Sequence, residues 1–151
     1  MFHSKALNNR INHLHERALK IAYKDTSSNF QELLDKDKSC TIHERNLKFL
    51  AIEMYKIQHD LAHIIMCDLF PIRTFTINLR SGNNFEKGNV RTVYNGTNTV
   101  SFQGPKIWNS LPECLKKAIS LKEFKVKIKK WKPTGCTCRI CTPYIHNLGF
   151  L

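Results

Sequence analysis

The segment that decides the fold is Leu47-Lys-Phe-Leu-Ala-Ile-Glu-Met-Tyr-Lys-Ile57, whose apolar residues recur at helical spacing. One apolar stripe consists of Leu47, Leu50, Met54, Ile57 and Leu61, and another face carries Ile42, Phe49 and Ile52. A helix that is apolar on two sides is normally buried, so we place this one in the core. Thr41 followed by Glu44 predicts its start. We expect it to continue or restart through Leu61–Phe70 and to stop before Pro71.

Two more helices are predicted before this segment. The first carries an apolar stripe at spacings of four and three, made of Leu7, Ile11, Leu14, Ala18 and Ile21. Arg10, Arg17 and Lys24 lie seven apart on a neighbouring face. Asp25-Thr-Ser-Ser-Asn29 then interrupts the pattern, because these side chains compete for backbone hydrogen bonds. Ser28 followed by Gln31 predicts a capping box for a short helix, Phe30–Asp37.

After Pro71 the helical period gives way to glycine, asparagine and short apolar-polar alternations. Val90–Tyr94 and Thr99–Gln103 flank Asn95-Gly-Thr-Asn98, which predicts a β-hairpin. Gly104-Pro-Lys-Ile-Trp-Asn-Ser-Leu-Pro112 then begins the C-terminal helices, with Pro105 suited to a first turn. We therefore expect a mainly α chain in four segments. These are a helical segment (1–70), an irregular segment with one hairpin (71–103), a basic helical segment (104–132) and a cysteine-rich tail (133–151).

The basic segment concentrates the positive charge of the chain. Residues 115–132 hold eight lysines and a single acid, Glu123, and so carry +7 of the total +12. Ser120 with Glu123 predicts a helix start. An apolar face is formed by Leu121, Phe124, Ile128 and Trp131, and beside it runs a stripe of Lys122, Lys125, Lys129 and Lys132. The stripe is about 15 Å long in a helix. Residues 124–128 also alternate with period two, so a half-buried strand is the alternative.

Such concentrated charge repels itself unless a polyanion shares it, so nucleic acid is the expected partner. The expected phosphate contacts are Lys116, Lys117, Lys122, Lys125, Lys129, Lys130 and Lys132, with Arg10, Arg17 and Lys24 as a second edge. That second edge has a simpler interpretation as a solvated helix flank. No pattern predicts base readout. Trp131 is read either as a base-stacking residue or as part of the core. Membrane-surface binding through the basic amphipathic segment is a further alternative.

The tail contains the best candidates for metal ligands. Cys136, Cys138, Cys141 and His146 supply three thiolates and an imidazole, a set that suits tetrahedral zinc. Free thiols, or a partial site completed by another chain segment, are the alternatives. Another set, His59, His63 and Cys67, is spaced to share one helical edge but lacks a clear fourth ligand, so we assign it a non-metal role.

Other classes of function are disfavoured by the sequence. No apolar run reaches the roughly 18 residues of a membrane span, and the N-terminus lacks the features of a secretory signal. Reduced thiols inside the cell, in the nucleus or cytoplasm, are the expected state of the six cysteines. The twelve acids are scattered, and the only close pair is Asp35 with Asp37. No phosphate-binding loop, nucleophile elbow or zinc-protease motif is present. We therefore expect a binding protein without catalysis of its own.

Several motifs, in order, resemble the region that follows the polymerase core in non-LTR (LINE-type) retrotransposon reverse transcriptases. They are Asn9–Ile21 with Tyr23-Lys-Asp25, Thr41–Leu47, Phe102–Pro112, Phe124–Trp131, and the ending Cys-x-Cys-x-x-Cys through Gly149-Phe-Leu151. The resemblance spans nearly the whole chain. It implies that the parent protein is an RNA-directed DNA polymerase, and that the catalytic palm and the endonuclease lie outside this sequence. None of that family's catalytic residues has a matching position here.

Two functions follow from the resemblance and the charge. The first is a C-terminal fragment that grips RNA or DNA through the lysine stripe. The second is a structural or protein-interaction fragment that needs the missing polymerase domains in order to fold. Zinc in the tail is the only cofactor that the sequence suggests, and the rest of a reverse transcriptase is the expected protein partner.

Overall fold

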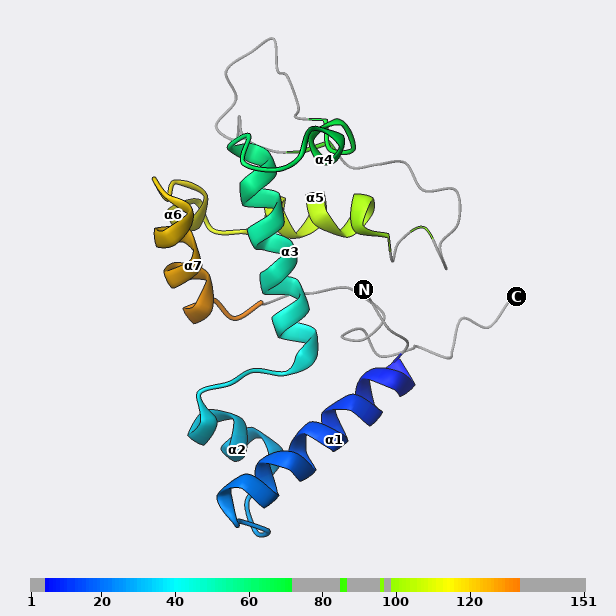
Figure 1. Cartoon of the computed structure of the whole chain (residues 1–151), viewed down its shortest axis with the longest axis vertical. Helices are drawn as coiled ribbons and strands as arrows, with labels where there is room; N and C mark the ends of the chain where they lie inside the picture. Colours follow the sequence, from blue (N-terminus) through cyan, green and yellow to red (C-terminus); the bar gives the residue numbers. More distant parts are fainter. Residues whose placement is uncertain (1–4, 72–84, 87–95, 97–98, 134–151) are drawn as a thin grey trace, which may run out of the picture. The chain divides into compact units, whose positions relative to one another are not determined.

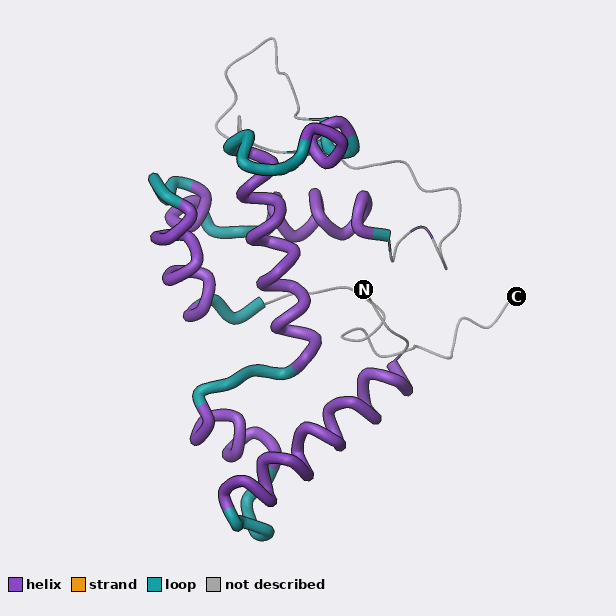
Figure 2. Tube along the Cα trace, viewed as in Figure 1, coloured by secondary structure: helices purple, strands orange, loops and turns teal. Residues whose placement is uncertain are grey.

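The computed structural model describes residues 5–71, 85–86, 96 and 99–133 (Figures 1 and 2). These residues form seven α-helices and contain no β-strand, which confirms the mainly α fold class. The described residues divide into two compact units, and the boundary in the sequence falls between Arg45 and Asn46. We call residues 5–45 the N-terminal unit and residues 46–132 the C-terminal unit, and we describe each by itself.

Five helices contribute to the C-terminal unit. They are α3 (Ile42–Gln58), α4 (Ile64–Asp68), α5 (Val100–Ser110), α6 (Glu113–Lys116) and α7 (Leu121–Lys130). In Figure 1, α5 crosses α3, α6 and α7 lie along one flank of α3, and α4 lies near its C-terminal end. The first turn of α3 belongs to the N-terminal unit.

Helix α3 is the core helix that the sequence predicts. Four residues of the predicted stripe are buried: Leu47, Leu50, Met54 and Ile57. Thr41 accepts a hydrogen bond from the Glu44 N–H at 3.3 Å, as expected for the start. The predicted second apolar face is not fully buried, because Phe49 is 54% exposed and Ile42 and Ile52 are half-buried. Tyr55, which the prediction did not include, is buried. The chain leaves the helix through Asp60, which adopts a left-handed conformation (φ 53°), and restarts as the short α4.

The core of the C-terminal unit is built from aromatic rings on three helices. Tyr55 of α3 stacks on Phe124 of α7 with 4.4 Å between ring centroids. Trp108 of α5 lies 6.4 Å from Tyr55 and 6.3 Å from Phe124. The Tyr55 hydroxyl donates a hydrogen bond to the Ala118 carbonyl at 2.9 Å, and burial raises the pKa of this phenol. These contacts fix α7 against α3 and thereby orient the lysines on its other side.

Part of the predicted hairpin is wrong. Its second strand, Thr99–Gln103, is the cap and first turn of α5, while its first strand lies outside the described residues. Helix forms here because Gly104, Ile107 and Trp108 share one face with Gln103, and all four are buried. Pro105 lies inside the helix instead of in its first turn. The hydrogen bond that it cannot donate would go to Ser101, an exposed residue whose carbonyl can be hydrated.

Helix α7 forms as predicted, and the strand alternative is wrong. Ser120 accepts a hydrogen bond from the Glu123 N–H at 3.2 Å. Phe124 and Ile128 are buried on the apolar face. The helix ends at Lys130, because Trp131 is extended (ψ 129°). Lys132 therefore follows the helix and does not continue the stripe.

In the N-terminal unit, α1 (Lys5–Tyr23) packs against α2 (Phe30–Asp37). Leu19 meets Leu33 and Leu34 in a small apolar cluster, with Phe30 against it. The rings of His15 and Phe30 meet edge to face at 5.6 Å. The predicted apolar stripe of α1 is mostly exposed, so the helix is confirmed but the stripe is not its buried face.

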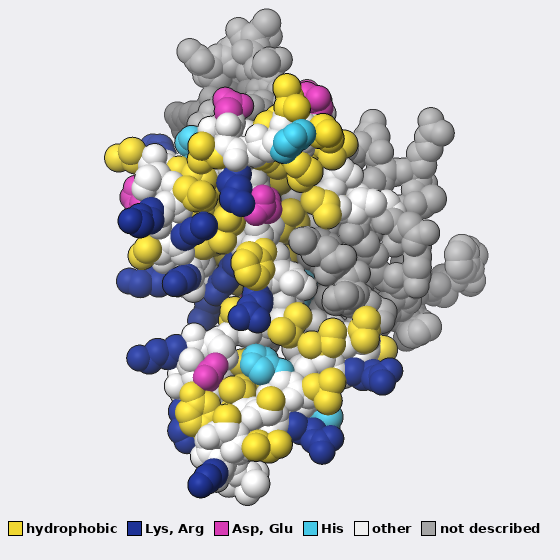
Figure 3. All heavy atoms as spheres, in the orientation of Figure 1, with side chains coloured by type: hydrophobic (Ala, Val, Ile, Leu, Met, Phe, Trp, Pro, Cys, Tyr) yellow, Lys and Arg dark blue, Asp and Glu magenta, His cyan; other side chains and the backbone are white. Residues whose placement is uncertain are grey.

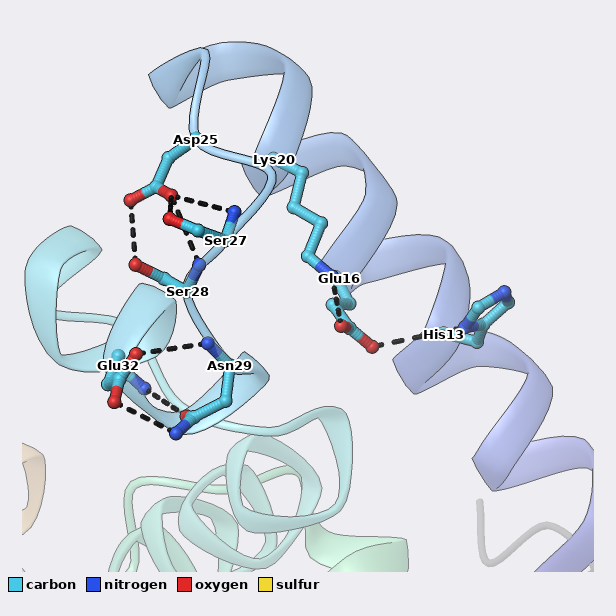
Figure 4. Close-up of polar contacts among 8 residues, drawn as sticks. All are labelled: His13, Glu16, Lys20, Asp25, Ser27, Ser28, Asn29 and Glu32. Carbon is cyan, nitrogen blue, oxygen red and sulfur yellow. Dashed lines mark hydrogen bonds and ion pairs between the residues drawn. The ribbon is translucent and has the colours of Figure 1, made fainter.

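The turn between α1 and α2 is held by one carboxylate (Figure 4). Asp25 accepts hydrogen bonds from the side-chain hydroxyls and the backbone N–H groups of Ser27 and Ser28, at 2.7–3.2 Å. The predicted capping box forms one residue later than expected. Asn29 accepts from the Glu32 N–H, and Glu32 accepts from the Asn29 N–H, each at 3.0 Å.

These bonds predict an acid-sensitive turn. Hydrogen bonds from the Ser28 hydroxyl, the Ser28 N–H and the Ser27 hydroxyl hold the pKa of Asp25 well below its usual range. Because this pKa is lower in the folded than in the unfolded chain, Asp25 stabilises the fold above about pH 4, and this contribution fades as pH falls further. We expect Asp25→Asn to lower the melting temperature at pH 7, and the difference in melting temperature from wild type to narrow as the pH falls from about 4 toward 2. Thermal melts followed by circular dichroism measure this. A difference in melting temperature that stays constant with pH would contradict this role of Asp25. Asp35→Asn, at an exposed position of α2, is the control.

Candidate nucleic-acid interface

The lysines of α7 form an exposed row on the side of the helix away from the core. Phe124 and Ile128 are buried in the core of the C-terminal unit, whereas Lys122, Lys125 and Lys129 are exposed. Their spacing of three and four places them on successive turns, about 10 Å from first to last. Figure 3 shows Lys and Arg side chains gathered over the α6 and α7 region. Ten ångströms of duplex axis carries about three phosphate charges on each strand, so the row of three lysines matches a short stretch of one backbone.

The only acidic residue of α7, Glu123, is paired within the protein. Glu123 forms an ion pair with Lys127, with Nζ and Oε1 2.6 Å apart. Its other oxygen accepts a hydrogen bond from the Ile119 N–H at 3.0 Å. The hydrogen bond from Lys127 is the main reason that the pKa of Glu123 lies below its usual range. Lys127, which also donates a hydrogen bond to the Cys114 carbonyl, thus acts within the protein and neutralises the carboxylate of α7.

A lysine from α3 supports the other end of α7. The Nζ atom of Lys48 donates a hydrogen bond to the Lys129 carbonyl at 3.0 Å. A cation at a helix C-terminus is favourable because it meets the negative end of the helix dipole. The sequence alone did not identify Lys48, since it lies 81 residues from its partner and carries no local signal.

Lys116 does not fit the phosphate contact that we expected from the sequence. Its side chain is only 5% exposed, and its Nζ lies 3.3 Å from a Glu113 carboxylate oxygen and 3.5 Å from the Asn109 carbonyl. The ammonium group is turned toward the end of α5, where it meets the helix dipole. Lys117, Lys130 and Lys132 are exposed and remain candidates.

The second basic edge belongs to the N-terminal unit and is treated as a separate surface. Arg10 and Arg17 are exposed on α1. Lys24 is exposed just past the end of that helix, in a left-handed conformation (φ 50°).

The predicted zinc ligands Cys136, Cys138, Cys141 and His146 lie outside the described residues. Within the described ranges, no group of three His, Cys, Asp or Glu side chains could hold a metal ion. His59, His63 and Cys67 do not share a helical edge, because α3 ends before the first of them. His59 packs on Tyr55 with centroids 4.2 Å apart, and His63 caps α4 through Nδ1.

Among the described residues, no helix is both long and apolar enough to cross a bilayer. Comparisons with protein-family models, curated proteins and solved structures found no match. The resemblance to retrotransposon reverse transcriptases therefore stays a prediction, and the geometry of α7 is the main support for a function.

Proposed function

We propose that this chain is a non-catalytic nucleic-acid-binding protein that contacts RNA or DNA through the α7 lysines. The interface comprises Lys122, Lys125 and Lys129 on the helix, with Lys117, Lys130 and Lys132 at its ends. The observation that carries the proposal is the exposed row of three lysines on successive turns, beside an acid that Lys127 already neutralises.

The chemistry of this surface supports binding to the phosphate backbone more than reading of bases. Lysine ammonium groups are point charges that displace condensed counterions, and nothing on this face resembles the paired donors that recognise a base edge. Four to six such contacts give log affinity a slope against log salt of about −3 to −5. We therefore expect binding that discriminates little between sequences and weakens steeply with salt.

We further propose, from the sequence resemblance, that the chain is the C-terminal part of a LINE-type reverse transcriptase. In that setting the α7 surface would hold template, primer or target, while the polymerase chemistry belongs to domains outside this sequence. A zinc ion held by Cys136, Cys138, Cys141 and His146 is part of the same proposal.

A structural role within a larger polymerase is the second candidate. The observation that favours it is an exposed apolar surface on and around α4, formed by Leu61, Ile64, Ile65 and Leu69. Apolar patches of this kind commonly mark contact with another protein or domain.

A charge-removal series tests the nucleic-acid proposal. The variant Lys122→Gln, Lys125→Gln, Lys129→Gln should bind a fluorescent 20-nucleotide RNA or DNA at least about tenfold more weakly at 50 mM salt, because three phosphate contacts are lost. The slope of log affinity against log salt should become shallower by roughly 2 to 3. Fluorescence anisotropy measures both quantities, and circular dichroism checks the fold.

The matched control removes the same charge elsewhere, with Lys5→Gln, Lys36→Gln and Lys38→Gln in the N-terminal unit. This control should retain most of the affinity and the original slope. Equal losses in the two variants would show that only the total charge matters. Unchanged binding in the α7 variant would refute the interface.

A further inference from the structure

The exposed face of α1 carries a continuous apolar row. Leu7 is 41% exposed, Leu14 63% and Ile21 78%, with exposed Ala18 and half-buried Ile11 between them. We call these five residues the α1 seam. Their spacings of four and three repeat every seven residues, which is the a/d pattern of a helix that packs along another helix.

The seam is not the face that α2 covers. Leu19 packs on α2, and the other buried residue of α1, Asn8, is polar and only 4% exposed. His15 meets Phe30 on this same side. Thus α1 turns a partly polar face inward and its longest apolar row outward. Figure 3 shows hydrophobic and basic side chains next to one another on the exposed surface of α1.

The charges beside the seam restrict what can cover it. One flank carries Arg10 and Arg17, both exposed and seven residues apart, and exposed Lys24 follows just past the end of the helix. The other flank, Asn8, His15 and Ala22, has no acid. The only acid within α1 is Glu16, which lies off both flanks and pairs with Lys20 at 2.8 Å.

A second copy of this chain is a poor occupant. In a parallel pair, Arg10 and Arg17 would face His15 and Ala22 of the other copy, and in an antiparallel pair the basic flanks would face one another. Neither arrangement offers an opposite charge. Nucleic acid could meet the arginines but gives no reason for exposed Leu14 and Ile21 beside them.

We propose that the α1 seam binds one amphipathic helix of a partner protein, with acidic residues along the edge that faces Arg10 and Arg17. The apolar residues supply the attraction, and the charge pairs fix the orientation and exclude basic helices. None of these residues belongs to the proposed α7 interface.

A designed peptide tests the proposal on the full chain. The probe is a fluorescein-labelled three-heptad helical peptide with Leu at positions a and d and Glu at positions e and g. The control peptide has Lys in place of each Glu. In anisotropy titrations at 150 mM NaCl, we expect the Glu peptide to bind at least about tenfold more tightly than the Lys peptide. The pair Leu14→Gln, Ile21→Gln should weaken this binding at least about tenfold, and Arg10→Gln, Arg17→Gln several-fold.

Two controls separate this result from the α7 interface. Replacement of Lys122, Lys125 and Lys129 by Gln should leave binding of the Glu peptide unchanged within about twofold. Replacement of the exposed residues Ile119 and Val126 by Gln should do the same. Equal affinity for both peptides, or binding that survives Leu14→Gln, Ile21→Gln, would overturn the proposal. Light scattering that shows a dimer, which Leu14→Gln, Ile21→Gln abolishes, would also overturn it. So would a result in which Arg10→Gln, Arg17→Gln weakens RNA binding and leaves peptide binding unchanged.

Discussion

Replacement of Trp108 by alanine is expected to destabilise the C-terminal unit by about 3–5 kcal/mol. The indole is fully buried and lies between the rings of Phe85, 5.9 Å away, and Phe124, 6.3 Å away. It is also near Tyr55, so its loss opens a cavity where α3, α5 and α7 meet. Small domains have a total stability of about 5–15 kcal/mol, so much of this unit should be unfolded at moderate urea concentrations.

The other tryptophan of the chain provides the control. Trp131 lies at the end of α7 and is only half-buried, so Trp131→Ala should cost clearly less. Urea titrations followed by circular dichroism compare the two variants with the wild type. If Trp108→Ala and Trp131→Ala unfold at the same urea concentration, the placement of Trp108 at the centre of the core is wrong. Binding through α7 should decline together with folding in Trp108→Ala, because α7 packs on the core through Phe124, which lies beside Trp108.

The features that the sequence predicted well are those with local causes. The start of α7 depends on Ser120 and Glu123, three residues apart, and the bounds of α2 depend on the polar turn before it. The buried stripe of α3 could be predicted because its period is set by the helix itself. The same reasoning applies to the row Lys122, Lys125 and Lys129, whose shared exposed face follows from spacing alone.

The features that it missed depend on residues distant in sequence. Asn-Gly at positions 95–96 is a local turn signal, but the buried face of α5, centred on Trp108, outweighs the β preference of Val100–Gln103. The outward orientation of the α1 seam could not be read from periodicity, which gives the apolar face but not its partner. The local sequence does not distinguish Lys116 and Lys48 from the other lysines. Their roles depend on hydrogen bonds to backbone carbonyl groups at the ends of α5 and α7.

Gly104→Ala is expected to destabilise the chain by about 1–2 kcal/mol, although the same change in an exposed helix would stabilise it by about 1 kcal/mol. A Cβ atom at position 104 would lie 2.7 Å from the sulfur of Met54 and 3.1 Å from a ring carbon of Phe70. Both neighbours are buried, so they have little room to move. The glycine thus sets how closely α5 approaches α3. Ser101→Ala, at an exposed position of the same helix, is the control and should be neutral or slightly stabilising.

A double-mutant cycle isolates this steric conflict. Met54→Ala alone removes a buried side chain and should cost about 2–5 kcal/mol. Together with Gly104→Ala, the new methyl group occupies part of the space that the Met54 side chain leaves. The double variant should therefore be about 1–2 kcal/mol more stable than the sum of the two single changes predicts. Urea titrations of all four proteins provide the cycle. A coupling energy near zero would mean that Gly104 and Met54 are not in contact, and that α5 does not cross α3 at this point.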